Sequence, residues 1–453
     1  MLANNDININ SVETRQRDAI VFDSRNGRTD EFTQTHHTAF VGGGDLTLQA
    51  DQDINLLGVN VTQDGHLQAQ AGRDITLSHT DDYSGQSRQI YTASSGFLSS
   101  STVEIHGSRE QHTSQLSQLS AEQITLKAGQ DINVTGSTLV ADQDLTLNAG
   151  RHVEISAAQN TLEESSFANK HRSGLMRGGN FGVFIGNQQQ TDTIDESRTQ
   201  LVSSALGSLN GDVSIQAGGD VTLTASDIIA TKGDINLSGE NVTLTSADNL
   251  YTRDEQHLFK QTGLTLSVSG GVIDTINTID HSINRINQSG DSRLQALHAW
   301  RVSNAIGNAL KEPTPPADGA DKTPDSPTAG MSISLSLGSS QSEQNRQLSQ
   351  TTAQGSTLIA EGDIHITARG HDDNPDSGDL ISRGSLIQAG NNITLDAADD
   401  IQLLSAENHE SDNSTNESSS AGIGLTFGGG SLVSVNVSAS ASRGVVNQSH
   451  VNT

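Results

Sequence analysis

The sequence predicts an all-β protein built around a parallel β-helix, and three observations support this prediction. A short phrase recurs along the chain, for example as GDLTL from Gly44 and GRDITL from Gly72. The residues Asp45, Asp53, His66 and Asp74 are spaced 8, 13 and 8 apart, which defines a period of 21. Aromatic residues make up only 3% of the chain, which suits a thin core of stacked aliphatic side chains. A fixed period of this length indicates a solenoid.

Each phrase reads as a tight turn followed by a short strand. In GDLTL, Leu46 and Leu48 point to one side of the strand and Thr47 points to the other. Glycine accepts positive φ, and aspartate hydrogen-bonds to its own backbone, so the Gly-Asp pair favours a turn. A coil of about 21 residues has no room for a crossover helix. We therefore expect a right-handed parallel β-helix whose coils stack at about 4.8 Å.

The phrase stops and restarts, and we expect the intervening segments to be insertions that leave the rod. The expected rod segments are residues 1–77, with an N-terminal hairpin-like stretch, 122–155, 211–245 and 355–404. The expected insertions are residues 78–121, 156–210, 246–354 and 405–453.

Each insertion has the pattern of a long β-hairpin. In the third, GLTLSVSGG from Gly263 matches GMSISLSLG from Gly330, and polar stretches flank both. The arms are polar near the rod and alternate apolar and small residues near the far end. Two interpretations stay open: the tips fold onto the rod or onto one another as a side sheet, or they form or join a membrane sheet. The candidate membrane- or partner-contacting residues are Phe181, Val183, Ile185, Leu264, Leu266, Val268, Ile333, Leu335, Leu337, Leu425, Phe427, Val433, Val435 and Val437.

The third insertion also predicts helices. Isoleucines recur every three or four residues from Ile273 to Ile286, and Leu294, Leu297 and Trp300 continue the stripe. This amphipathic pattern favours packing on the sheet, with a membrane-surface or partner helix as the alternative. Residues 312–328 hold five of the six prolines and predict an extended linker.

The sequence offers no catalytic, cofactor-binding or metal-binding motif. It contains no HExxH, Walker loop or GxSxG motif, and no cysteine. We therefore expect no enzyme and no cofactor. The net charge of −29 argues against nucleic acid and anionic lipid as partners. The repeated aspartates are turn caps or, alternatively, a calcium-binding row: Asp45, Asp53, Asp74, Asp131, Asp144, Asp220 and Asp234.

The phrases GDLTLQADQDINLLG and AGQDINVTGSTLVADQDLTLNAGRHVEI closely resemble the hemagglutinin repeats of filamentous hemagglutinins. The insertions with GLMRGGNFGVFIG and GLTLSVSGG are similar to the second repeat region of contact-dependent growth inhibition exoproteins. This resemblance implies a Gram-negative protein of a two-partner secretion system, whose outer-membrane transporter engages a domain that this sequence does not show. It also implies a region that helps to carry a toxin across the outer membrane of a target cell.

The resemblance leads to an expected function. We expect a non-catalytic delivery stalk of a secreted, cell-surface toxin exoprotein that contacts the target cell. The alternatives are an adhesin rod that binds host or bacterial surfaces and, more remotely, a polysaccharide-active β-helix enzyme. The sequence shows no signal peptide, transmembrane helix or toxin module, so we expect a piece of a longer protein. Its oligomeric state stays open.

Overall fold

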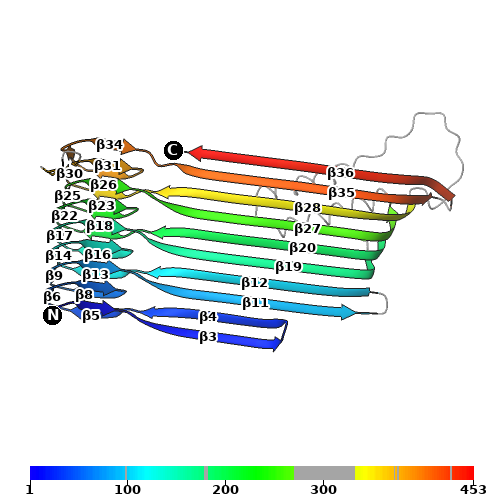
Figure 1. Ribbon diagram of the computed structural model, residues 1–453, viewed down its shortest axis with the longest axis horizontal. Helices are drawn as coiled ribbons and strands as arrows, with labels where there is room; N and C mark the ends of the chain where they lie inside the picture. Colours follow the sequence, from blue (N-terminus) through cyan, green and yellow to red (C-terminus); the bar gives the residue numbers. More distant parts are fainter. Residues whose placement is uncertain are drawn as a thin grey trace, which may run out of the picture.

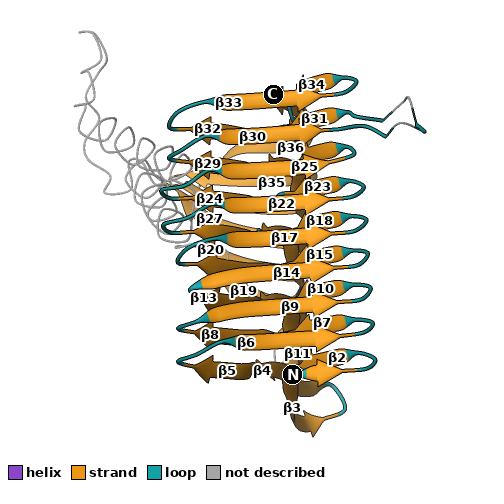
Figure 2. Cartoon of the chain, turned by 90° about the vertical axis from the view of Figure 1, so that its left-hand side faces the viewer, coloured by secondary structure: helices purple, strands orange, loops and turns teal. Residues whose placement is uncertain are grey.

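The protein is all-β in the part of the chain that the structure, a computed structural model, describes. Three parallel sheets stack coil upon coil into a rod, and a fourth, antiparallel sheet projects from one side of it (Figure 1). The stacked coils are seen from the side in Figure 2. The described residues are 1–96, 99–177, 182–269, 332–371, 373–374, 377–428 and 431–452.

The rod consists of two nine-stranded sheets and one eight-stranded sheet. The first contains β1 (Leu2–Ala3), β6 (Leu46–Ala50), β9 (His66–Ala71), β14 (Gln123–Ala128), β17 (Leu145–Ala149), β22 (Val213–Ala217), β25 (Ile235–Gly239), β30 (Ile364–Ala368) and β33 (Ile393–Ala397). The second contains β2 (Ile7–Asn10), β7 (Ile54–Leu57), β10 (Ile75–Ser78), β15 (Ile132–Thr135), β18 (Val153–Ser156), β23 (Val221–Thr224), β26 (Val242–Thr245), β31 (Leu380–Arg383) and β34 (Ile401–Leu404). The third contains β5 (Thr38–Gly42), β8 (Val59–Gln63), β13 (Ser117–Ala121), β16 (Ser137–Ala141), β21 (Ala205–Ser208), β24 (Asp227–Ala230), β29 (Thr357–Ala360) and β32 (Leu386–Ala389).

The core of the rod is made of the apolar residues of the repeated phrase. Ile124 pairs with Leu145, and Leu126 with Leu147, on neighbouring parallel strands. All four side chains are at most 1% exposed. The alternation in each strand therefore stacks like residues above one another, as the phrase predicts. The right-handed sense of the coil stays a prediction.

The aspartates of the phrase connect successive coils through their side chains. Asp53 accepts a hydrogen bond from the backbone N–H of Asp74 (3.2 Å), and Asp74 accepts one from Asp131 (3.0 Å). The carboxylates thereby satisfy turn donors that the strands leave free. Asp220 accepts a bond across coils from the side-chain amide of Asn241 (2.8 Å). The other aspartates of this set accept backbone N–H groups across coils: Asp45, Asp131, Asp144 and Asp234. Within the described ranges, no group of three or more His, Asp or Glu side chains is placed to hold a metal ion.

One corner of the rod, between the second and third sheets, alternates between two constructions. In every second coil, the chain turns there on one or two residues, one of which has positive φ: Gly58, Gly136, Ala225 or Gly384. In the coils between, the chain leaves the rod at this corner as a hairpin. No pattern in the sequence predicts this alternation.

The hairpins pair edge to edge into one ten-stranded sheet, the hairpin sheet. A hairpin is two strands wide, and two coils are two strands high, so both repeat at about 10 Å. Hairpins from alternate coils therefore lie next to one another without a gap (Figure 1). The strands are β3 (Val12–Asp23), β4 (Asn26–His36), β11 (Thr80–Ser95), β12 (Ser99–Gln115), β19 (Ala158–Arg177), β20 (Gly182–Val202), β27 (Ala247–Ser269), β28 (Ser332–Gln354), β35 (Asn408–Gly428) and β36 (Ser431–Asn452).

Buried serines join the bases of three hairpins to the rod. Ser117, Ser204 and Ser356 are at most 1% exposed and follow directly after a hairpin. Their hydroxyls donate to the carbonyl oxygens of Ser78 (2.6 Å), Ser156 (2.6 Å) and Thr245 (3.1 Å), the last strand residue before each hairpin.

The predicted helices and the proline-rich stretch of residues 312–328 lie outside the described residues. The described part of the chain contains strands and no helix. Accordingly, no helix in that part is long and apolar enough to cross a membrane.

Candidate interaction surface

The distal part of the hairpin sheet carries one aliphatic face. Because alternate residues of a strand point to opposite sides, paired residues on neighbouring strands share a face. Ile185 pairs with Leu264, and Leu264 pairs with Leu337. The row continues through Ile423 to Val437, so it crosses five strands. A second row runs next to it on the same face through Leu266, Leu335, Leu425 and Val435.

This face, which we call the aliphatic face, is open in the described structure. Leu337 is 60% exposed, Val435 58% and Val437 79%, whereas the aliphatic residues in the core of the rod are buried. An apolar surface of this kind on one sheet face marks a place for a partner or a membrane. Val433, a predicted tip residue, stands at a bulge of β36 and has no partner in the register. The described members of the face are Leu175, Ile185, Leu264, Leu266, Leu335, Leu337, Ile423, Leu425, Phe427, Leu432, Val435 and Val437.

The structure brings most of the predicted tip residues together. Val183, Val268 and Ile333 hold the expected backbone register, since Val183 pairs with Leu266 and Val268 with Ile333. Phe181 lies outside the described residues. The sequence analysis missed Ile423, although the alternation of GIGLTF from Gly422 places it on the same face as Leu425. The role of the predicted tip residues in contacting a membrane or a partner stays a prediction.

The opposite face of the same strands is polar and small. Thr265 pairs with Ser336, Ser336 with Gly424, and Gly424 with Asn436. The neighbouring row consists of glycines on five strands, and the pairs follow in the order Gly174, Gly186, Gly263, Gly338 and Gly422. The distal sheet therefore has an aliphatic face and a face of hydroxyls, amides and glycines.

Phe184 covers part of this glycine row and is only 5% exposed. A Cβ atom added to Gly186 would lie 2.8 Å from Phe184 Cζ, and one added to Gly263 would lie 2.9 Å from it. The ring therefore fills the space that the missing side chains leave, as aromatic residues do over glycines in sheets. Phe184 is not among the residues predicted from the sequence, because the alternation in NFGVFIG selects Phe181, Val183 and Ile185 instead.

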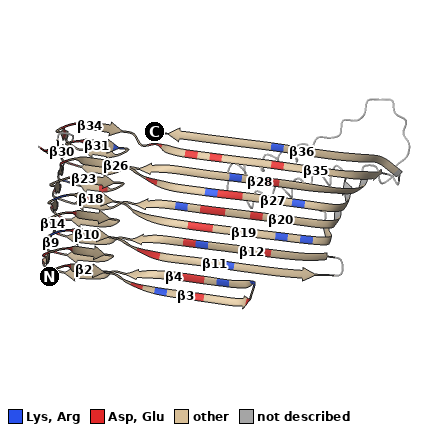
Figure 3. Ribbon diagram, viewed as in Figure 1, with Lys and Arg blue, Asp and Glu red and all other residues tan. Residues whose placement is uncertain are grey.

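Charged residues lie along much of the hairpin strands, reaching the distal end of β19 and the tip of β3, whereas the distal ends of β28, β35 and β36 carry none (Figure 3). Arg346 donates to Asp412 through Nε (3.1 Å) and Nη2 (2.8 Å), and these bonds lower the pKa of Asp412. Like charges also meet here, since Glu110 pairs with Glu163 in the register. The proximal part of the hairpin sheet therefore presents charged side chains, unlike the distal ends of β28, β35 and β36.

A family model described as "Hemagglutinin repeat" matches residues 22–93, 95–264 and 335–453. A protein named 16S rRNA endonuclease CdiA from Enterobacter cloacae subsp. cloacae is 32% identical over 401 residues, which cover 87% of this chain and 12% of that protein. Deoxyribonuclease CdiA of Dickeya dadantii is 33% identical over 394 residues, covering 86% of this chain and 11% of that protein. tRNA nuclease CdiA of Escherichia coli O6:K15:H31 is 35% identical over 276 residues, which cover 60% of this chain and 8% of that protein.

The chain thus spans a small part of the length of these relatives. No solved structure matches it. The matched residues include most of the rod and most of the described hairpin sheet. The chain belongs to the hemagglutinin repeat family and is homologous to the CdiA contact-dependent inhibition toxins over most of its length.

Proposed function

We propose that this chain is a non-catalytic stalk of a secreted toxin exoprotein, and that it engages the outer membrane of a target cell through the aliphatic face. The observation that carries the proposal is the alignment of Ile185, Leu264, Leu337, Ile423 and Val437 across five strands. A rod with an apolar core and a separate apolar surface on its hairpin sheet suits a stalk that holds a toxin module away from the cell and brings it to a target membrane.

The dimensions of the aliphatic face are compatible with a membrane role. The stretch of β27 from Gly263 to Ser269, in which apolar residues alternate with small polar ones, is about 20 Å long at the usual rise of a strand. Outer-membrane strands carry an apolar band of about 25 Å. The absence of charged residues from the distal ends of β28, β35 and β36 supports the same role, because charge is costly in lipid.

The relatives support a role other than nuclease action for this region. Their names give three different substrates, tRNA, DNA and 16S rRNA, yet their identity to this chain is 35%, 33% and 32%. The sequence of this region therefore does not change with the nucleic acid that the relative cleaves. We infer from the family that the parent protein is exported by a two-partner system and contacts target cells.

Liposome flotation tests the proposal. The test variant carries Leu337→Ser, Val435→Ser and Val437→Ser, three exposed positions on the aliphatic face. The matched control carries Ser336→Ala, Ser434→Ala and Ser438→Ala on the opposite face of the same strands. We expect the natural chain and the control to float with outer-membrane lipid vesicles and the test variant to stay in the dense fraction.

Two results would contradict the proposal. The first is that the natural chain fails to float, and the second is that the test variant floats as well as the control. If flotation fails while the chain still binds to whole cells, the adhesin alternative is favoured.

A further inference from the structure

A second candidate site lies on the first five strands of the hairpin sheet, β3 to β19, halfway along the longer strands and away from their distal ends. It is a trough of about 500 Å³, within the usual size of small-ligand sites. It exists because the β3–β4 hairpin is shorter than its neighbour. β4 pairs with β11 only from Tyr83 to Gln89, whereas β11 continues to Ser95. The turn of the first hairpin therefore ends beside the middle of β11.

The turn that borders the trough is held in place by several contacts. Asp23 accepts hydrogen bonds from Asn26 Nδ2 (2.8 Å) and from the backbone N–H of Arg25 (2.7 Å), and the bond from Asn26 contributes most to a lowered pKa of Asp23. Asn26 Oδ1 in turn accepts the backbone N–H of Tyr91 (2.7 Å). The guanidinium of Arg25 lies 4.6 Å from the centre of the Tyr91 ring. These contacts join the turn to the edge of β11.

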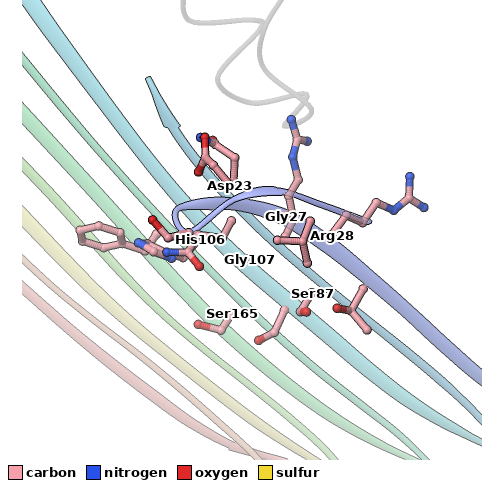
Figure 4. A pocket seen from close by; sticks show the side chains of 15 residues that line it. Asp23, Gly27, Arg28, Ser87, His106, Gly107 and Ser165 are labelled. Atoms are coloured by element: carbon pink, nitrogen blue, oxygen red, sulfur yellow. The ribbon is translucent and has the colours of Figure 1, made fainter. Parts of the chain in front are cut away.

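The floor of the trough is a row of hydroxyls. Thr29 pairs with Ser87, Ser87 with Ser108, and Ser108 with Ser165, so four short polar side chains lie on one face of four neighbouring strands. Figure 4 shows Ser87 and Ser165 on one side of the trough and Asp23 and Gly27 of the first hairpin on the other. Neighbouring strands are about 4.8 Å apart, so the hydroxyls are spaced regularly.

One wall of the trough is taller and partly apolar. Gln89, His106 and Phe167 form the next row on the same face. The rings of His106 and Phe167 are 5.8 Å apart, and Glu104 accepts a hydrogen bond from His106 if the ring nitrogen carries the proton (2.9 Å). Phe167 is half-buried, so part of its ring is open to a ligand. A ligand here would meet hydroxyls below and an aromatic ring at the side.

Most charged groups beside the trough are carboxylates. Two arginines, Arg28 and Arg88, also line it, and Arg28 is paired with Asp30 (2.7 Å). The adjacent depression on the same face is lined by Glu110, Glu163, Asp195 and Asp254. Glu110 pairs with Glu163 and Asp195 with Asp254, so carboxylates stand next to the floor of the trough. The chain as a whole carries a net charge of −29. We therefore expect sulfated, phosphorylated and sialylated ligands to bind more weakly here than neutral ones.

We propose that this trough binds a neutral glycan of one or two pyranose units. A pyranose has a ring of C–H groups that packs on an aromatic side chain and hydroxyls that exchange hydrogen bonds with serine, threonine and glutamine. Thr29, Ser87, Ser108 and Ser165, with Gln89, present those partners next to Phe167. The site is independent of the aliphatic face, because it uses the middle of β4, β11, β12 and β19 instead of the distal ends of β19 to β36.

A glycan array of neutral, sialylated and sulfated oligosaccharides, probed with the purified chain, tests the proposal, followed by titration calorimetry with the best neutral glycan. We expect neutral glycans to bind more tightly than sialylated or sulfated ones. Ser108→Val puts apolar atoms on the floor and should weaken binding at least tenfold, and Phe167→Ala should do the same. Ser411→Val changes a serine on the same face of β35, far across the sheet, and should leave binding unchanged.

Phe167→Leu keeps an apolar side chain at this position and serves if Phe167→Ala fails to fold; we expect it to weaken binding too. The proposal is overturned if no neutral glycan binds or if only anionic glycans bind. It is also overturned if Ser108→Val and a folded Phe167 variant bind as tightly as the natural chain.

Discussion

The hydroxyl of Ser204 donates a hydrogen bond of 2.6 Å to the carbonyl oxygen of Ser156, 48 residues earlier in the chain. Between these two residues lies the whole β19–β20 hairpin. The same hydroxyl accepts the backbone N–H of Ser137 from the preceding coil (3.1 Å). One buried side chain therefore ties the two arms of a long hairpin to each other and to the rod.

Replacing Ser204 with alanine should lower the free energy of unfolding by about 1–3 kcal/mol. It leaves the buried N–H of Ser137 without a partner and removes one of the two hydrogen bonds to the Ser156 carbonyl, which keeps the bond from the N–H of Gly136. Chemical denaturation would measure the loss, and hydrogen exchange would locate it at the base of the hairpin. Ser120→Ala changes an exposed serine of β13 and should have little effect. Equal stability of the two variants would show that Ser204 does not hold the hairpin.

The rod should lose stability in acid through Asp53 and Asp131. Hydrogen bonds from Arg73 and Arg151 are the main cause of a lowered pKa in these carboxyls. A carboxyl with a lowered pKa in the folded state stabilises the fold above its unfolded pKa, about 4. That stabilisation disappears as the pH falls from there through the folded pKa.

Asp131→Asn should therefore flatten the dependence of the melting temperature on pH between about 7 and 3. An asparagine oxygen can still accept the bond from the next coil, as Asn241 does from Asp379. The matched control is Asp144→Asn, which keeps its coil-to-coil bond to Asp212 and has no arginine within ion-pair distance in the described part. A pH profile that the first variant leaves unchanged would refute this role.

Two of the short turns of the rod should respond oppositely to glycine and alanine. Ala225 has a φ of 48°, a conformation that costs an L-residue about 1 kcal/mol, so Ala225→Gly should be neutral or stabilising by up to about 1 kcal/mol. Gly136 has a φ of 52°, and an added Cβ would lie 2.8 Å from His79 Nδ1. Gly136→Ala should thus destabilise by more than about 1 kcal/mol. Thermal unfolding of the two variants and the natural chain measures both effects. A Gly136→Ala variant that melts at the same temperature as the natural chain would contradict this account.

Removing the ring of Phe184 should loosen the distal sheet. Phe184→Ala opens a space over Gly186 and Gly263, and the loss of a buried phenylalanine typically costs about 3–5 kcal/mol. We expect faster hydrogen exchange in the distal amides of β20 and β27, with the rod unaffected. Phe184→Leu should restore part of the protection. Unchanged exchange in the alanine variant would show that the ring is not needed there.

The sequence by itself determined the rod, the identity of its core residues and the existence of hairpins. The period of 21 and the alternation of apolar residues are local signals, and Ile124, Leu145 and their equivalents are buried as that alternation requires. The alternation in GLTLSVS likewise identified the apolar residues of the tips, because side-chain direction in a strand depends only on neighbours in sequence.

Only the tertiary structure decided how the hairpins pair. Five hairpins become one sheet because alternate coils space them at two strand widths, a match between distant parts of the chain. The row from Ile185 to Val437 and the trough beside Phe167 both depend on this register. No local pattern contains it, because hydrogen bonds between strands far apart in sequence set which residues stand side by side.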